Sequence, residues 1–206
     1  MRVSIRHAET YSRGQLILRT LFGIFYIMIP HFLVMLFVII GVLFVNFIAF
    51  WAILITGRYP EGLWKFMFGF FAWQVRLNAR LNNLSDGYPA IGPNGSDTET
   101  KLEIEYQASY SRGLVLARLF FGLFYIMIPH GFCLFFLSLA AAFVKVFAFW
   151  IVLITAKYPK GLHDFMVGVI RWNTKVGAYY YNLTDTYPPF RLSEVEDSST
   201  ALDKNI

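Results

Sequence analysis

Two histidines at equivalent places in the chain could carry chemistry. His31 and His130 each follow a proline inside a long apolar stretch, in the segments GIFYIMIPH and GLFYIMIPH. Imidazole titrates near neutral pH and binds metals readily, so the two could share a metal ion or a proton path. Two ligands fall short of a zinc site, however, and no carboxylate accompanies them. We therefore predict an intramembrane polar pair without metal or cofactor; the alternative is that each imidazole bonds a carbonyl freed by the proline.

Basic side chains gather at the ends of the same apolar stretches. They are Arg13, Arg19, Arg58, Arg112, Arg118 and Lys157. Such cations can bind anionic lipid headgroups, at about 1 kcal/mol for each charge near the surface, although simple anchoring of the topology is the alternative. Because the charges follow these boundaries, the net charge of +5 does not indicate a nucleic-acid partner. We predict that these six side chains contact lipid headgroups.

The carboxylates offer no catalytic pattern. Asp86 and Asp185, in Ser-Asp-Gly-Tyr-Pro and Thr-Asp-Thr-Tyr-Pro, are typical of turns. His163 and Asp164 form a dyad that the first half of the chain lacks. The sequence contains no nucleophile elbow, phosphate-binding loop or HExxH motif. We expect a non-enzymatic protein with no catalytic or cofactor-binding residues.

The elements that carry these residues occur twice. Besides the histidines, Trp51 corresponds to Trp150 and Tyr59-Pro60 to Tyr158-Pro159. A fixed internal period indicates a tandem duplication whose units bury apolar surface against each other. We predict repeat 1 over residues 1–89, a linker over 90–100, repeat 2 over 101–190 and a flexible acidic tail over 191–206.

The composition is that of a membrane protein. Hydrophobic residues make up 57% of the chain and charged residues 15%, against roughly 25% charged in average chains. The apolar stretches, residues 16–56 and 114–155, each have the length for about two crossings of a bilayer. The first lacks the cleavage site of a signal peptide, so we expect it to be retained. Cys133 is the one cysteine, which excludes a disulfide within the chain.

Each repeat is expected to begin with a short strand and to continue as a membrane hairpin. Residues 2–7 and 101–106 alternate apolar and polar side chains, and the two segments could pair or act as extended linkers. One straight helix over an apolar stretch would be about 60 Å long, twice the hydrocarbon thickness. Lys145 would then lie near the middle of the membrane. A turn at residues 41–46 and 140–145 avoids both problems.

Charge placement also favours an even number of crossings. Basic residues flank both ends of each apolar stretch, and a hairpin puts both ends on one side of the membrane. One crossing per repeat, with inverted copies, is the alternative. Residues 60–84 and 159–183 combine apolar faces with Trp, Lys and Arg, as in an interfacial amphipathic helix or else a further crossing. The predicted fold is mainly α and integral to the membrane: two tandem copies of a transmembrane helical hairpin plus an interfacial amphipathic helix, with a short strand before each copy.

The order of these motifs resembles a known bacterial membrane family. Ser-Arg-Gly precedes Ile-Pro-His, Leu-Ile-Thr and Tyr-Pro, and each copy ends at Asp-x-Tyr-Pro. In this order the chain is similar to the family called domain of unknown function 4389. The second copy, which ends in Pro188-Pro189-Phe190, is the closer match, whereas the first departs at Ala90. The resemblance implies a membrane fold and carries no activity.

These observations predict a non-enzymatic structural or accessory subunit of a larger bacterial membrane protein complex. Its contacts would come from aromatic faces that include Phe22, Phe25, Phe66, Phe70 and Trp73. The alternative is a small lipid-handling protein or transporter with a site between the repeats, since duplicated halves often enclose a site on their shared axis. Expected partners are membrane lipids and other membrane protein subunits. The expected location is the bacterial inner membrane, multi-pass, with the termini and the linker in the cytoplasm.

Overall fold

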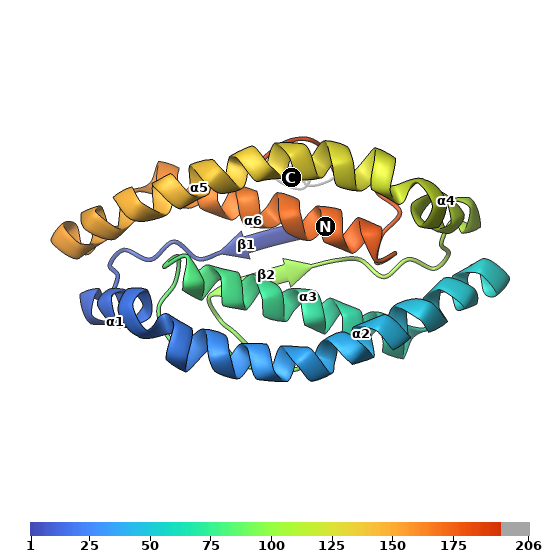
Figure 1. Ribbon diagram of the computed structural model, residues 1–206, viewed down its shortest axis with the longest axis horizontal. Coiled ribbons are helices and arrows are strands. Elements are labelled where there is room, and N and C mark those ends of the chain that lie inside the picture. Colours follow the sequence, from blue (N-terminus) through green and yellow to red (C-terminus); the bar gives the residue numbers. More distant parts are fainter. Residues whose placement is uncertain (195–206) are drawn as a thin grey trace, which may run out of the picture.

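The computed structural model describes residues 1–194 and consists of two similar halves around a short sheet (Figure 1). The first half contains β1 (Arg2–Ile5), α1 (Arg13–Gly23), the π-helical η1 (Ile24–Met28), α2 (Ile29–Thr56) and α3 (Glu61–Leu81). The second half contains β2 (Thr100–Glu103), α4 (Arg112–Gly122), the π-helical η2 (Leu123–Met127), α5 (Ile128–Thr155) and α6 (Lys160–Tyr180). Most of the predicted acidic tail, from residue 195 on, lies outside the described residues.

Each apolar stretch forms one continuous, bent helix, so the predicted hairpin is wrong. α2 continues through residues 41–46 and α5 through residues 140–145 without a turn. The irregularity falls instead at η1 and η2, next to Pro30 and Pro129. Proline has no N–H to donate, and a π-helical turn shifts the neighbouring hydrogen bonds, so that Ile29 donates to the carbonyl of Ile24. The chain therefore passes the proline without reversing its direction.

The long helices need no turn because their inner sides have protein partners. Val42, Ala49 and Ile53 of α2 are buried in the core. Lys145, whose charge favoured a turn in the sequence, lines a cavity between the two halves. α2 ends at Gly57, which has a φ of 72° that glycine adopts without strain.

β1 and β2 pair in antiparallel register, which confirms the predicted pairing of the two copies. Arg2 lies opposite Glu103, and Val3 lies opposite Leu102. Val3 and Leu102 are both buried, so the inner face of this small sheet is part of the core. Neither strand has a partner within its own half, and main-chain hydrogen bonds therefore tie the halves together.

The start of each half also binds the end of the other half's long helix. The N–H of Tyr11 donates to the carbonyl of Ala156 at 2.8 Å, and the guanidinium of Arg13 donates to Ile154 at 2.7 Å. The last carbonyls of a helix have no partner within the helix, and these contacts supply one. The equivalent contacts in the other direction join Tyr110 to Gly57 and Arg112 to Ile55.

The loop between the halves is fixed against α3. Arg80 and Asp97 form an ion pair at 2.8 Å, with 4% and 7% of their side chains exposed. Burial raises the pKa of Asp97, but hydrogen bonds from Arg80 and Thr100 outweigh it, so the pKa lies below its ordinary value. The loop backbone at Pro93 approaches Gly69 so closely that any side chain there would collide with it. The predicted linker is therefore held in place by packing and by the buried ion pair.

We expect a crosslink between cysteines at Ser4 and Lys101 in a Cys133→Ser background. The two positions lie opposite each other in the sheet and are exposed, and such pairs have Cβ atoms about 5 Å apart. Oxidation should therefore give a faster-migrating monomer on denaturing gels. The pair Ser4→Cys with Glu105→Cys lies four residues out of register and is the control. Equal crosslinking of both pairs would exclude this register.

Candidate functional site

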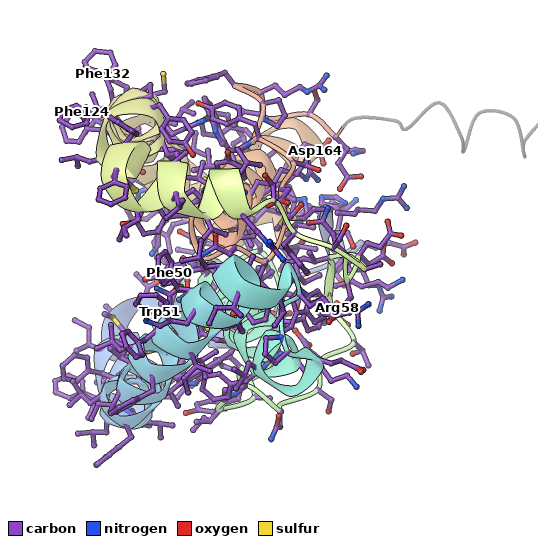
Figure 2. All side chains as sticks on the ribbon, turned by 90° about the vertical axis from the view of Figure 1, so that its right-hand side faces the viewer. Phe50, Trp51, Arg58, Phe124, Phe132 and Asp164 are labelled. Carbon is purple, nitrogen blue, oxygen red and sulfur yellow. The ribbon has the colours of Figure 1, made fainter. Side chains whose placement is uncertain are left out.

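Exposed apolar side chains lie on one side of the molecule and charged side chains on the other. Figure 2 shows Phe124 and Phe132 projecting from one side, while Arg58 and Asp164 lie on the opposite side. We call the first side the apolar face; it comes from the bent helices α1–α2 and α4–α5. Its most exposed members include Phe25, Phe37, Phe44, Phe47, Phe124, Phe132, Phe143 and Phe147. A soluble monomer rarely exposes so large a contiguous apolar surface.

The same two helices are the ones long and apolar enough to cross a membrane within the described part of the chain. In their most apolar segments, 17% and 11% of the residues are buried inside the molecule. The core helix of a soluble protein would be mostly buried instead. No charged residue occurs between residues 20 and 57. By length and composition, these helices therefore suggest association with a membrane.

Each of the two histidines has a tryptophan partner in its own half. Nδ1 of His31 accepts a hydrogen bond from the indole N–H of Trp73 at 2.8 Å, and Nδ1 of His130 accepts one from Trp172 at 3.0 Å. The ring of Phe190 stacks on His130 with a centroid distance of 4.0 Å. Both histidines are almost fully buried. These bonds satisfy indole N–H groups that would otherwise be buried without a partner.

The arrangement brings no metal ligands together. Among residues 1–194, no group of three or more His, Cys, Asp and Glu side chains is placed to hold a metal ion. The contacts of each histidine are with aromatic residues of its own half, such as Tyr88 for His31 and Tyr187 for His130. A role for His31 and His130 as a functional pair stays a prediction.

Arg19 and Arg118 are buried and paired with aspartates. Arg19 donates to Asp86 at 2.9 Å and also to the carbonyl of Ser85, and its side chain is 3% exposed. In the second half, Arg118 donates to Asp185 at 3.0 Å and to Asn182 at 2.7 Å. The side chain of Arg118 is 2% exposed. Protein partners thus occupy the two guanidinium groups that the sequence assigned to lipid headgroups.

The aspartates join three segments of each half. Asp86 accepts a hydrogen bond from the main-chain N–H of Ser12 at 2.8 Å, directly before α1, while it also pairs with Arg19. A carboxylate at a helix N-terminus satisfies a free N–H and stabilises the helix dipole. Asp185 binds Ser111 and Arg118 in the same way. The sequence interpretation found turns here and missed the pairs; the equal spacing of Arg and Asp in both repeats was the signal.

The remaining predicted headgroup contacts differ in their surroundings. Arg13 and Arg112 bind carbonyls at the ends of α5 and α2. Arg58 and Lys157 directly follow these helix ends and are exposed. Trp51 and Trp150, at the same helix ends, are 47% and 57% exposed. Tryptophan next to a cation is typical of the boundary between lipid and water.

A second histidine pair departs from the symmetry of the two halves. The rings of His7 and His163 lie 4.8 Å apart, whereas the equivalent contact between the halves joins Tyr106 and Trp64. Burial lowers the pKa of His163, and the nearby His7 lowers it further, while Asp164 opposes both effects. The His163 to Asp164 separation is 3.7 Å. The predicted dyad is therefore part of an aromatic contact between the halves.

A cavity of about 730 Å³ lies between the two halves. α2 and α5 form its walls, and α3 and α6 contribute the remaining lining. Its polar lining residues are Gln74, Asn78, Asn82, Ser138, Lys145, Asn173, Thr174 and Tyr181. Ile39 and Leu43 line it and are 43% and 62% exposed, so the cavity reaches the apolar face. Its volume is in the range of sites that bind small molecules.

The chain belongs to the family described as Domain of unknown function (DUF4389). The family profile matches residues 14–91 and 115–191, one segment in each half, which confirms both the resemblance and the duplication. The matched segments contain the histidines, the Arg–Asp pairs and the residues that line the cavity. No curated protein and no solved structure matches the chain. The geometry of the site is therefore the basis for any statement about function.

We expect Asp185→Asn to lower the free energy of unfolding by about 3 kcal/mol, because it leaves the buried charge of Arg118 without its counterion. Unfolding in mild detergent, followed by circular dichroism, measures this loss. The matched control is Asp164→Asn, which breaks an exposed pair with Lys160 and should cost less than about 0.5 kcal/mol. Equal losses in the two variants would contradict a structural role for the buried pair.

Proposed function

We propose that this chain is a non-enzymatic, lipid-handling membrane protein of the bacterial inner membrane. In this proposal the apolar face enters one leaflet from the cytoplasmic side. The observation that carries the proposal is the one-sided distribution of exposed apolar side chains in both halves (Figure 2). Burying one large apolar side chain stabilises by about 1.5 to 3 kcal/mol. A face with many such side chains therefore gains far more from lipid than from water.

The position of the polar elements supports an orientation with the long helices along the membrane. α3 and α6 lie beside α2 and α5 over much of their length, and β1 and β2 lie between α3 and α6 (Figure 1). If α2 and α5 crossed the bilayer, the charged side chains of the sheet would lie at the same depth as the apolar helices. Unpaired strand edges and charges are costly within hydrocarbon. Lying along the membrane, the molecule puts its apolar face in lipid and its charged side in water.

The boundary residues support the same orientation. Trp51 lies in the last two turns of α2 and Arg58 follows the end of that helix, and Trp150 and Lys157 have the same places at α5. In the proposed orientation Trp51 and Trp150 lie at headgroup depth, where tryptophan is favoured, and Arg58 and Lys157 lie on the water side of the headgroups. Arg58 and Lys157 then provide the attraction to anionic lipids. The basic residues also favour the cytoplasmic side.

An accessory subunit is the second candidate function, because Phe22 and Phe25 are 53% and 66% exposed. A membrane protein partner could cover these side chains in place of lipid. Phe70 and Trp73, which the sequence interpretation assigned to partner contacts, are buried in this chain's own core. Purification from the native membrane in mild detergent tests this candidate. Stoichiometric co-purification of defined subunits would favour it over lipid handling.

We expect nitroxide labels at Phe37 and Phe47 to lie at similar depths in the bilayer. Both side chains belong to the apolar face, with 76% and 63% exposed. Ten residues of helix span about 15 Å, so a helix along the membrane gives similar depths and a crossing helix gives a difference of about 15 Å. Oxygen and nickel accessibility in proteoliposomes measures the depth.

A label at Glu61, on the charged side, is the control for this measurement. Its side chain is 63% exposed and should be accessible to water-soluble nickel. A depth difference near 15 Å between Phe37 and Phe47 would show that α2 crosses the bilayer, as in the alternative of one crossing per repeat, and would overturn the orientation. Accessibility of both labels to nickel would exclude insertion of the apolar face.

A further inference from the structure

The cavity between the halves lies on their shared axis but is not symmetric. Its wall on α2 is formed by Ile39, Val42 and Leu43. The equivalent wall on α5 is formed by Ser138, Ala141 and Ala142. The three branched apolar side chains of α2 thus correspond to three small side chains on α5, and the cavity is wider next to α5. The second half has thus created room next to Lys145.

Lys145 is a cation without a counterion among the described residues. It is half-buried and lines the cavity, and no hydrogen bond or ion pair joins it to residues 1–194. Among residues 1–194, no acidic side chain lines the cavity. The equivalent residue in the first half is the neutral Asn46. A half-buried ammonium group is costly unless an anion or water accompanies it.

The other polar groups of the cavity are suited to phosphate and hydroxyl oxygens. Gln74, Asn78 and Asn173 are amides that can donate hydrogen bonds, and Ser138 is a hydroxyl that can do so. They come from α3, α6 and α5. In the proposed orientation, α3 and α6 lie on the water side of α2 and α5, and the exposed Ile39 and Leu43 lie at the lipid side. The cavity lining therefore changes from polar on the water side to apolar on the lipid side. The headgroup and the acyl chains of a phospholipid in the leaflet are arranged in the same order.

We propose that this cavity binds one anionic phospholipid. Its phosphate pairs with Lys145, the amides bind the oxygens of the headgroup, and its acyl chains leave between α2 and α5 to the apolar face. This inference deepens the proposed function and rests on insertion of that face. It assigns the lipid class and the residue that selects it. Arg58 and Lys157, in contrast, lie outside the cavity and attract the anionic headgroups of the surrounding bilayer.

Native mass spectrometry of the full chain in mild detergent tests the proposal. We expect one phosphatidylglycerol to remain bound in preference to phosphatidylcholine with the same acyl chains. Lys145→Gln should weaken phosphatidylglycerol binding about tenfold or more and abolish the preference. Lys65→Gln is the matched control, because Lys65 is an exposed lysine paired with Glu61 away from the cavity. It should bind as the unmodified protein does.

A second variant tests the place of binding without removing a charge. Ala142→Leu restores the side chain of Leu43 at an exposed position of α5 and should reduce binding of both lipids, with the melting temperature unchanged. Excess glycerol phosphate should not displace the lipid, because it lacks acyl chains. Displacement by glycerol phosphate, unchanged binding in Lys145→Gln, or equal retention of both lipids would each overturn the proposal. Because no bilayer is present, this result is independent of the depth measurement.

Discussion

The exchange of hydrogen bonds between the two halves is the constraint on which the rest of the structure depends. Each half provides a strand that has no partner of its own and a long helix whose last carbonyls are free. The other half supplies both: β1 pairs with β2, and the residues before α1 and α4 bind the ends of α5 and α2. With the helices fixed at these points, their outer sides form one continuous apolar face. The cavity between them follows from the same arrangement.

The buried Arg–Asp pairs hold each bent helix against the other long helix of its own half. Arg19 lies on the inner side of α1, and Asp86 follows α3. Their ion pair therefore fixes α1 against the end of α3. The His31–Trp73 bond joins α2 to α3 further along. Both contacts recur in the second half. The two buried arginines and the two histidines beneath the apolar face thus have partners within the protein, which leaves Lys145 as the cation there that has none among residues 1–194.

The sequence predicted the features that depend on local pattern. Alternation over residues 2–7 predicted β1, the amphipathic pattern of residues 60–84 predicted α3, and the repeated motifs predicted two equivalent halves. The hairpin was wrong because π-helical turns let the chain pass Pro30 and Pro129 without reversing, and because the inner sides of the long helices pack on the protein. Lys145, which the sequence argument placed in hydrocarbon or in water, lines a cavity instead. The Arg19–Asp86 pair was missed because the two residues are far apart in the sequence and each had a local explanation. The cavity could not be predicted because its lining comes from four helices, and the sequence does not show which of their faces lie opposite one another.

The exchanged strands and helix ends also bear on how such a chain arises. A single repeat would leave its strand edge and its helix end unsatisfied, and a twofold dimer of two such chains would satisfy both. Joining two copies in one chain keeps these contacts. Identical subunits must carry the same side chain at both positions, whereas joined copies can differ. The pairing of Asn46 in one copy with Lys145 in the other is a difference that only the fused form permits.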